Sequence, residues 1–241
     1  GHRFLAWERE TYSGGGRVPF AKSGTPTWKR LWDLKVGDHI AVSSTLPEPT
    51  ELVSIPDWEV EWVGMMIGDG CVSKSSKGYY NHNLTIGYQS PIQKAHCLQL
   101  IEDRGLKVRV ADDGRKFTLF PTHGTGSRGK FHPMRDLMDR YKLSGHKAAT
   151  KHIPKEFFSL STRQVALLVS RLIDTDGWVS ISNTGEVGYG TVSEQLAEDL
   201  IHLLLRLGVV GEKKVKNTTY NGELYTSYQV RVRKQGELLK L

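Results

Sequence analysis

Two segments of the chain share a pattern in which an apolar run ends in an aspartate and a glycine. Residues 62–70 are WVGMMIGDG and residues 169–177 are VSRLIDTDG, so Asp69 and Asp176 occupy the same place in each. Paired carboxylates, completed by water and phosphate oxygens, are ligands that suit Mg²⁺. The pattern predicts a two-aspartate site for divalent cations. The alternative is a pair of ordinary helix-terminal turns.

The two carboxylates can meet only if each run forms a helix and the helices pack closely. Gly64 and Gly68 stand four residues apart and share one side of the first helix. With Ser170 from the second helix, we expect them to form the helix interface. A carboxylate at a helix C-terminus opposes the helix dipole, which favours a functional role for it. Gly68 and Thr175, which directly precede the aspartates, are further expected metal ligands.

The elements around these segments follow one order twice. The first series has helices at 58–67, 91–104 and 134–141 and strands at 71–75, 84–88, 107–110 and 116–120. The second has helices at 162–175 and 194–207 and strands at 178–182, 187–191, 212–217 and 225–233. This order predicts an α+β fold of two pseudo-symmetric αββαββα halves, 57–150 and 151–241, with curved antiparallel sheets. A small β-rich segment, 1–50, precedes a linker containing Pro47, Pro49 and Pro56.

Composition indicates a globular protein with a polyanionic partner. The chain has 33 Lys and Arg against 26 Asp and Glu, a net charge of +7, although a solvated basic face is the alternative. No apolar run is long enough to span a membrane, so we expect a cytoplasmic protein without a membrane partner. Cys71 and Cys97 lie far apart, so we expect both to be reduced and buried rather than bound to zinc.

Basic and polar residues alternate with apolar ones along the expected strands. Gln229, Arg231 and Arg233 fall on one face and Val230 and Val232 on the other. Two-stranded ribbons fit the DNA major groove, where Arg reads guanine and Gln reads adenine. The sheets would thus form a DNA-binding saddle, although a solvated role stays open for each residue. The candidate DNA-binding residues are Lys74, Tyr80, Tyr88, Lys107, Arg109, Lys116, Arg128, Ser180, Ser182, Lys214, Lys216, Gln229, Arg231 and Arg233.

The segments 62–70 and 169–177 resemble the paired nine-residue motif of LAGLIDADG homing endonucleases, whose eighth position is acidic. Arg171 departs from that motif, because it stands where the family usually has glycine. Residues 151–154, KHIP, resemble a Lys-x-Ile-Pro block of intein endonucleases in which the lysine is catalytic. The resemblance implies that Asp69, Asp176 and Lys151 are catalytic. A solvated Lys151 before a turn proline is the alternative.

Residues 1–5, GHRFL, and 32–41, WDLKVGDHIA, resemble part of the Hint domain of inteins, the domain that carries out protein splicing. An intein origin is implied. Splicing needs a nucleophilic first residue and a terminal His-Asn pair, whereas this sequence starts with Gly1 and finishes with Leu241. We therefore do not expect it to splice.

The resemblance implies a site-specific endonuclease that hydrolyses both strands of double-stranded DNA and leaves 3′ overhangs. Mg²⁺ is the expected cofactor, and Mn²⁺ or Ca²⁺ can occupy the same sites. Because the two halves differ in sequence, we expect one chain to cover a long asymmetric target as a monomer, without an obligate protein partner. The alternatives are a cleavage-inactive, maturase-like or regulatory binding protein, a splicing module, and a generic basic binding domain.

Overall fold

The chain divides into two units, residues 1–44 and residues 45–241. The structure, a computed structural model, describes residues 2–7, 26–36, 38–74, 80–85, 91–121, 133–180 and 185–232. In the first unit, an antiparallel sheet has the order β2-β1-β3 and is accompanied by a short 3₁₀ helix, Leu31–Asp33. Its strands are β1 (Arg3–Trp7), β2 (Thr27–Arg30) and β3 (His39–Ile40). This β-rich unit ends at residue 44, whereas the sequence predicts a β-rich segment of residues 1–50.

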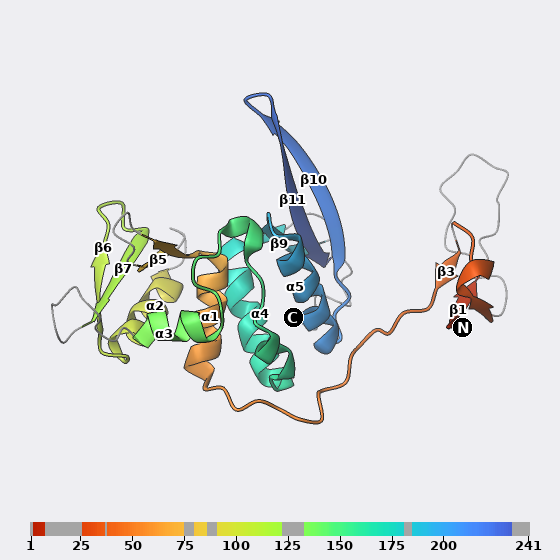
Figure 1. Cartoon of the computed structure of the whole chain (residues 1–241), viewed down its shortest axis with the longest axis horizontal. Coiled ribbons are helices and arrows are strands. Elements are labelled where there is room, and N and C mark those ends of the chain that lie inside the picture. Colours follow the sequence, from red (N-terminus) through yellow and green to blue (C-terminus); the bar gives the residue numbers. More distant parts are fainter. Residues whose placement is uncertain are drawn as a thin grey trace. The chain divides into compact units, whose positions relative to one another are not determined.

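The second unit contains two similar halves, each built on one helix that leads directly into a four-stranded antiparallel sheet (Figure 1). The first half has α1 (Asp57–Gly68), β4 (Gly70–Lys74), β5 (Tyr80–Thr85), α2 (Pro91–Glu102), β6 (Leu106–Val110), β7 (Lys116–Pro121) and α3 (Pro133–Arg140). The second has α4 (Thr162–Asp176), β8 (Gly177–Ser180), β9 (Glu186–Thr191), α5 (Glu194–Arg206), β10 (Glu212–Tyr220) and β11 (Glu223–Val232).

The two sheets have the same topology. Their orders are β4-β5-β7-β6 and β8-β9-β11-β10, so in each half the second strand pairs with the fourth. The α+β fold and its repeat are therefore confirmed. Strand β5 begins at Tyr80, earlier than the predicted start at Leu84. The last helix predicted for the second half would fall outside the described residues.

Local sequence signals determine where several elements begin and end. The side chains of Ser161 and Ser193 accept hydrogen bonds from the main-chain nitrogens of Gln164 and Leu196, which caps α4 and α5. Between β10 and β11, Asn221 and Gly222 have φ of 50° and 81°. Two consecutive left-handed residues give the turn whose twist matches a β-hairpin, which is why an Asn-Gly pair stands there.

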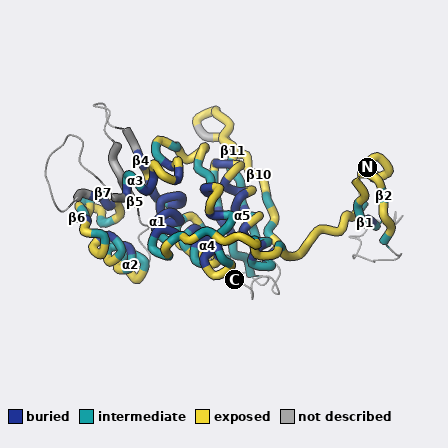
Figure 2. Tube along the Cα trace, turned by 60° about the horizontal axis from the view of Figure 1, so that its bottom comes forward, coloured by how far each residue is buried: buried dark blue, intermediate teal, exposed yellow. Residues whose placement is uncertain are grey.

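Helices α1 and α4 pack along each other and form the centre of the second unit. Val60 and Val63 of α1 and Val165, Leu168 and Leu172 of α4 are all fully buried, and buried residues are concentrated around these helices in Figure 2. Each such side chain contributes about 1.5–3 kcal/mol relative to exposure to water. Helix α1 is apolar on nearly every side because it is covered by both halves.

Polar contacts fix the N-terminal ends of the two central helices. Arg163 of α4 donates two hydrogen bonds of 2.7 Å to the Asp57 carboxylate of α1. Next to it, Gln164 donates to the carbonyl oxygen of Ile55 at 2.6 Å. These contacts join the N-terminal ends of the two helices, and close packing at Gly64 and Gly68 brings their C-terminal ends together.

The proline-rich segment predicted as a linker is bound along the second half. The Leu46 nitrogen donates to the Leu205 carbonyl and the Val53 nitrogen to the Ser159 carbonyl, each at 3.0 Å. The Glu48 carboxylate accepts a 2.6 Å hydrogen bond from the nitrogen of Thr162, at the start of α4. Residues 46–53 are thus part of the folded second unit, since their main chain finds hydrogen-bond partners on it.

Candidate active site

The C-terminal ends of α1 and α4 bring the two motif aspartates to one place. Helix α1 ends at Gly68 and is capped by Asp69, while Asp176 is the last residue of α4. Each carboxylate acts electrostatically on the same two side chains, those of Lys151 and Tyr189. The residues that precede the aspartates are in contact, because a Cβ atom at Gly68 would lie 2.5 Å from the Thr175 Cβ. The Lys151 side chain, which bonds the Gly68 carbonyl, lines the same hollow as Asp176. The structure therefore juxtaposes the aspartates that the sequence pattern paired.

Glycine is required on α1 because the helices approach so closely. A Cβ atom at Gly64 would lie 2.8 Å from the Arg171 Cβ, and one at Gly68 would lie 2.5 Å from the Thr175 Cβ. Carbon atoms are in optimal contact only at about 3.5–4.0 Å. The structure thus places Gly64 and Gly68 at the helix interface, as the sequence predicts.

Ser170 does not lie at that interface, and the expectation for it is corrected. Its side chain is exposed, and its Oγ donates to the Leu167 carbonyl at 2.8 Å. Leu168, Arg171 and Thr175 face the glycines instead. Residues three and four apart share a helix face, whereas Ser170 lies about 100° away from Arg171 around the helix.

We predict that Gly68→Ala destabilises the protein. Alanine favours a helix by about 1 kcal/mol over glycine, but overpacking against Thr175 costs about 1–3 kcal/mol, so a net loss is expected. Urea unfolding measures it, and adding Thr175→Gly, which removes the opposing side chain, should recover part of the loss. A Gly68→Ala variant as stable as wild type would contradict the close packing.

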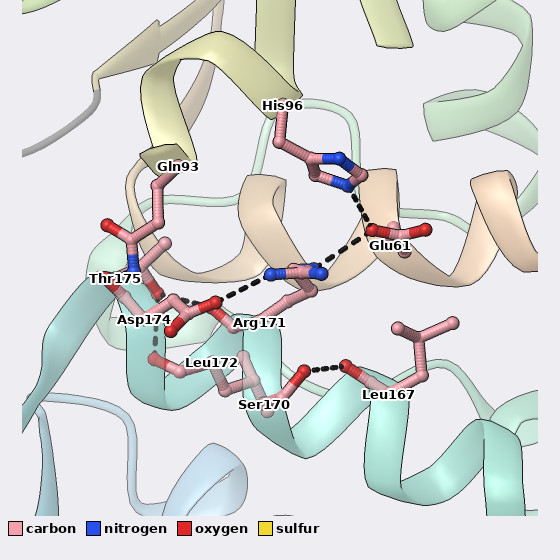
Figure 3. Close-up of polar contacts among 9 residues, drawn as sticks. All are labelled: Glu61, Gln93, His96, Leu167, Ser170, Arg171, Leu172, Asp174 and Thr175. Carbon is pink, nitrogen blue, oxygen red and sulfur yellow. Dashed lines mark hydrogen bonds and ion pairs between the residues drawn. The ribbon is translucent and has the colours of Figure 1, made fainter. Parts of the chain in front are cut away.

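An ion-pair network shows how the second helix accommodates Arg171, the residue that departs from the family motif (Figure 3). Its Nε donates to Glu61 of α1 at 3.0 Å, and its Nη1 donates to Asp174 at 2.7 Å. His96 of α2 contacts the same Glu61 carboxylate at 2.5 Å. The arginine fits because Gly64 makes room for it and because these carboxylates balance its charge.

Lys151 reaches the site from the segment between the halves. The Ser193 Oγ donates to the Lys151 carbonyl at 2.6 Å, and the Ile153 nitrogen donates to the Asp199 carboxylate at 2.9 Å. So anchored, the partly buried Lys151 side chain donates from Nζ to the carbonyl oxygen of Gly68. Its competitor Lys147 is exposed and caps a 3₁₀ helix (Ala148–Thr150) through its main chain.

Burial and charge act in opposite directions on Lys151 and Asp176. Burial lowers the pKa of the Lys151 ammonium group below its usual value, although Asp176 and Asp69 both work against this. Although the Asp176 side chain reaches solvent, desolvation by its surroundings raises its pKa, and Lys151 opposes that shift. Such shifts arise where charged groups meet in a poorly hydrated place, which is common at functional sites.

The donor atoms of the site suit a hard cation. Among the described residues no cluster of three or more His, Cys, Asp or Glu could hold a metal ion, so protein ligands would be the two carboxylates and main-chain carbonyls. The Thr175 hydroxyl donates to the Leu172 carbonyl of its own helix at 2.8 Å. An all-oxygen set completed by water and phosphate fits Mg²⁺.

An open hollow of about 350 Å³ lies beside Lys151 and Asp176. Residues of the second sheet also line this hollow, among them Gly190, Lys216 and Gln229. The pairing Gly190↔Gln229 puts these two residues on one face of the sheet, and Lys214↔Gln229 adds Lys214 to it. The acidic site therefore continues into a basic sheet face, an arrangement that would let a polyanion cross both.

The second sheet has the two-sided character predicted for β11. Val230 and Val232 are buried toward the helices, while Gln229 and Arg231 lie on the opposite face. There the Arg231 Nε donates to the Gln229 Oε1 at 3.1 Å and lies 3.7 Å from the Glu186 carboxylate, so the long side chain is already oriented. Ser180, paired with Glu186, is half-buried at the sheet edge.

In the first sheet, Lys107, Arg109 and Lys116 are exposed, whereas Leu106 and Val108 pack toward the core. Lys74 and Tyr80 belong to β4 and β5, but their side chains lie outside the described part of the structure. The remaining candidate DNA-binding residues lie outside the described residues: Tyr88, Arg128, Ser182 and Arg233.

Of the two cysteines expected to be buried, Cys97 is buried and Cys71 is not, and Trp178 is a side chain near the second motif that the sequence-based expectation missed. Cys71, expected to be buried, is exposed because alternation along β4 turns its neighbour Val72 into the core. Burial raises the pKa of the other cysteine, Cys97, to about 12. The Trp178 indole packs against Gly188, where a Cβ atom would lie 2.5 Å from the indole Cε2. Because Gly188 pairs with both Trp178 and Arg231, these two side chains lie on the same face of the sheet. The two glycines of β9 were the available signal for Trp178.

A known family model matches the part of the chain that contains the second motif, residues 169–177. Residues 163–241 match the family model of a LAGLIDADG-like domain. The replicative DNA helicase DnaB of Synechocystis sp. is 26% identical over 216 residues, covering 88% of this chain and 24% of that protein. Protein RecA of Mycobacterium tuberculosis is 29% identical over 191 residues, which cover 76% of this chain and 22% of that protein. The chain thus spans about a quarter of the length of these relatives.

Solved structures with a similar chain course include two homing endonucleases. I-DmoI in complex with DNA and Ca is 14% identical, with a TM-score of 0.49 over 76% of this chain and 86% of that one. I-WcaI bound to its DNA recognition sequence is 13% identical, with a TM-score of 0.42 over 75% of this chain and 77% of that one.

No helix within the described residues is both long and apolar enough to cross a bilayer.

Proposed function

We propose that this chain is a site-specific double-stranded DNA endonuclease of the LAGLIDADG homing type that hydrolyses phosphodiester bonds with Mg²⁺. The observation that carries the proposal is the convergence of Asp69 and Asp176 on Lys151 at the ends of two packed helices. The family match of residues 163–241 includes the second of these helices from Arg163 onward, with Asp176. A basic sheet face beside the site would receive the DNA.

An intein origin is part of the proposal. The relatives have different names, among them the helicase DnaB, the protein RecA and a DNA gyrase, yet the chain matches only 22–36% of these proteins. A segment shared by otherwise different proteins is expected if it has been inserted into several host genes. The resemblance of residues 1–5 and 32–41 to a Hint domain supports the same origin, and an intracellular, DNA-associated location would follow from it.

In the proposed mechanism, Asp69 and Asp176 hold the cation together with the main-chain carbonyls of Gly68 and Thr175. A bound Mg²⁺ supplies Lewis-acid stabilisation of a phosphate and activation of water. The Lys151 ammonium group would balance the negative charge that develops at the scissile phosphate, where a poorly hydrated setting makes such a charge effective. Its contact with the Gly68 carbonyl keeps it beside the carboxylates.

The two sheets would bind DNA on either side of the cleavage site. Exposed cations in each sheet can contact phosphates, which provides affinity, while Gln229 and Arg231 can read base edges in the major groove. The corresponding strands of the halves carry different residues, so an asymmetric target read by a single chain is expected. Cleavage of both strands to leave 3′ overhangs is part of the proposal.

The proposed DNA face predicts a specific salt dependence. The logarithm of duplex affinity falls with the logarithm of salt concentration by about 0.9 per phosphate contact. Replacing both Lys214 and Lys216 by alanine should therefore make this slope shallower by about 1.8. Fluorescence anisotropy of a labelled duplex between low and physiological salt measures the slope.

Lys213 provides the matched control for that experiment. It lies beside Lys214 but on the helix-facing side, where its ammonium group bonds Glu194 at 2.9 Å and Glu198 at 2.6 Å. The Lys213→Ala variant should keep the wild-type slope. A double variant with an unchanged slope, or an equal change in Lys213→Ala, would place the DNA elsewhere.

Cleavage of a defined duplex tests the proposed function. The substrate joins the two host-gene sequences that flank the whole proposed intein, which recreates the uninterrupted insertion site. With Mg²⁺ we expect one double-strand cut with 3′ overhangs at the junction, and EDTA should abolish it. Tight binding without any cut would instead support a cleavage-inactive binding protein of the same fold.

A further inference from the structure

Tyr189 lies directly behind the two-aspartate site. In the second sheet it pairs with Gly177, the residue after Asp176, and on its other side with Val230. Because Val230 is buried toward the helices and paired residues share a face, the Tyr189 ring is also directed to the helices. Only 1% of the residue is exposed. The phenol is therefore enclosed between β9 and the helices that carry the aspartates.

The hydroxyl of this tyrosine has no hydrogen-bond partner among the residues that the structure describes. A buried hydroxyl normally has a partner, because leaving one unsatisfied costs about as much as a lost hydrogen bond. Burial and the negative charges of Asp176 and Asp69 raise the pKa of the phenol, so both carboxylates act on it. The hydroxyl thus stays protonated and can only gain by donating toward the aspartates.

The matching register position of the first half holds a different residue type. Gly70, which follows Asp69, pairs with Leu84 in the same way that Gly177 pairs with Tyr189. One half therefore has a hydroxyl at this register position and the other has an aliphatic residue. A phenyl or aliphatic side chain at position 189 would fill the core equally well. The hydroxyl of Tyr189 therefore needs an explanation other than packing.

We propose that Tyr189 is a positioning residue of the cation site, whose hydroxyl donates a hydrogen bond to the Asp176 carboxylate when a divalent cation is bound. The inference rests on the proposed function, because it assumes that Asp176 is a metal ligand. A carboxylate that binds a cation through one oxygen leaves the other free to accept a hydrogen bond, and such contacts to ligands tune metal affinity. Tyr189 would thereby fix the orientation of one of the two aspartates.

The test compares cation affinity with stability in the Tyr189→Phe variant, which removes only the hydroxyl. Mn²⁺ is titrated into the DNA-free protein, and the EPR signal of the free ion gives the dissociation constant. We expect affinity to fall about 2- to 10-fold, the effect of one lost hydrogen bond. The metal-free melting temperature should not fall, because the removed hydroxyl has no partner among the described residues.

Tyr141→Phe is the matched control. Tyr141 is also buried, but its hydroxyl donates to Glu59 at 2.7 Å, away from the aspartates. Its variant should lower the melting temperature and leave Mn²⁺ affinity unchanged. If Tyr189→Phe behaves like Tyr141→Phe, or if both variants lose affinity equally, Tyr189 is purely structural and the inference is overturned.

Asp176→Asn separates this inference from the proposed function. If it loses Mn²⁺ binding while Tyr189→Phe binds normally, only the role of Tyr189 fails. If it binds Mn²⁺ as wild type does, Asp176 is not a ligand and the metal assignment fails with it.

Discussion

Asp69→Asn and Asp176→Asn should each abolish DNA cleavage while leaving duplex binding nearly unchanged. Asparagine keeps the shape of aspartate but removes the charge that a divalent cation requires at this helix end. The loss should be at least about 10³-fold in cleavage rate, the scale seen when one electrostatic group at a reacting centre is removed. Single-turnover cleavage of the junction duplex with Mg²⁺ measures the rate, and anisotropy of the same duplex in Ca²⁺ measures binding.

Asp174→Asn is the control for the aspartate variants. Asp174 lies in the same helix only two residues from Asp176, but its carboxylate bonds Arg171 at 2.7 Å. Its replacement removes an equal charge from the same helix and should leave the cleavage rate within a few-fold of wild type. Undiminished cutting by Asp69→Asn or Asp176→Asn would show that these residues are turn residues without a catalytic role.

Lys151→Ala should slow cleavage about 10²- to 10³-fold, the second largest effect that we expect. Its ammonium group is partly buried near the motif aspartates. The Lys151 carbonyl accepts a hydrogen bond from Ser193, and two residues later the Ile153 nitrogen donates to Asp199, so the main chain on both sides is held in place. We expect an ammonium group held in this way to stabilise charge at the reacting phosphate and to contribute little to the affinity for the DNA duplex. Duplex binding should therefore weaken only a few-fold in the same anisotropy assay.

Lys147→Ala provides the comparison for Lys151, because Lys147 is exposed and lies just four residues earlier in the chain. Its cleavage rate should stay near that of wild type. If Lys151→Ala loses rate and affinity in equal measure, Lys151 is a phosphate-binding residue and has no role in the chemical step.

Repetition made most of the fold predictable. An apolar helix, an Asp-Gly step and two strands occur twice, and a repeated local pattern that needs a partner to cover its apolar face predicts pairing of the copies. Turn residues such as Asn221 and Gly222 gave the hairpin between β10 and β11 from their conformational preferences alone. Alternation along β11 likewise gave the buried face of Val230 and Val232.

The remaining errors concern contacts that depend on how elements dock. The sequence predicts Ser170 at the helix interface, but the packing of α4 against the glycines of α1 turns Arg171 inward instead. The charge of Arg171 is balanced by Glu61 from another helix, which no local pattern could predict. Tyr189 gains significance only because its strand lies behind both aspartates.

Anomalous diffraction from crystals of the protein with its uncut duplex and Mn²⁺ tests the central claim most directly. We predict a manganese peak bound by both Asp69 and Asp176 and by a phosphate oxygen of the DNA backbone. Peaks bound elsewhere, or at only one of the two carboxylates in each complex, would contradict a shared cation site at the ends of α1 and α4.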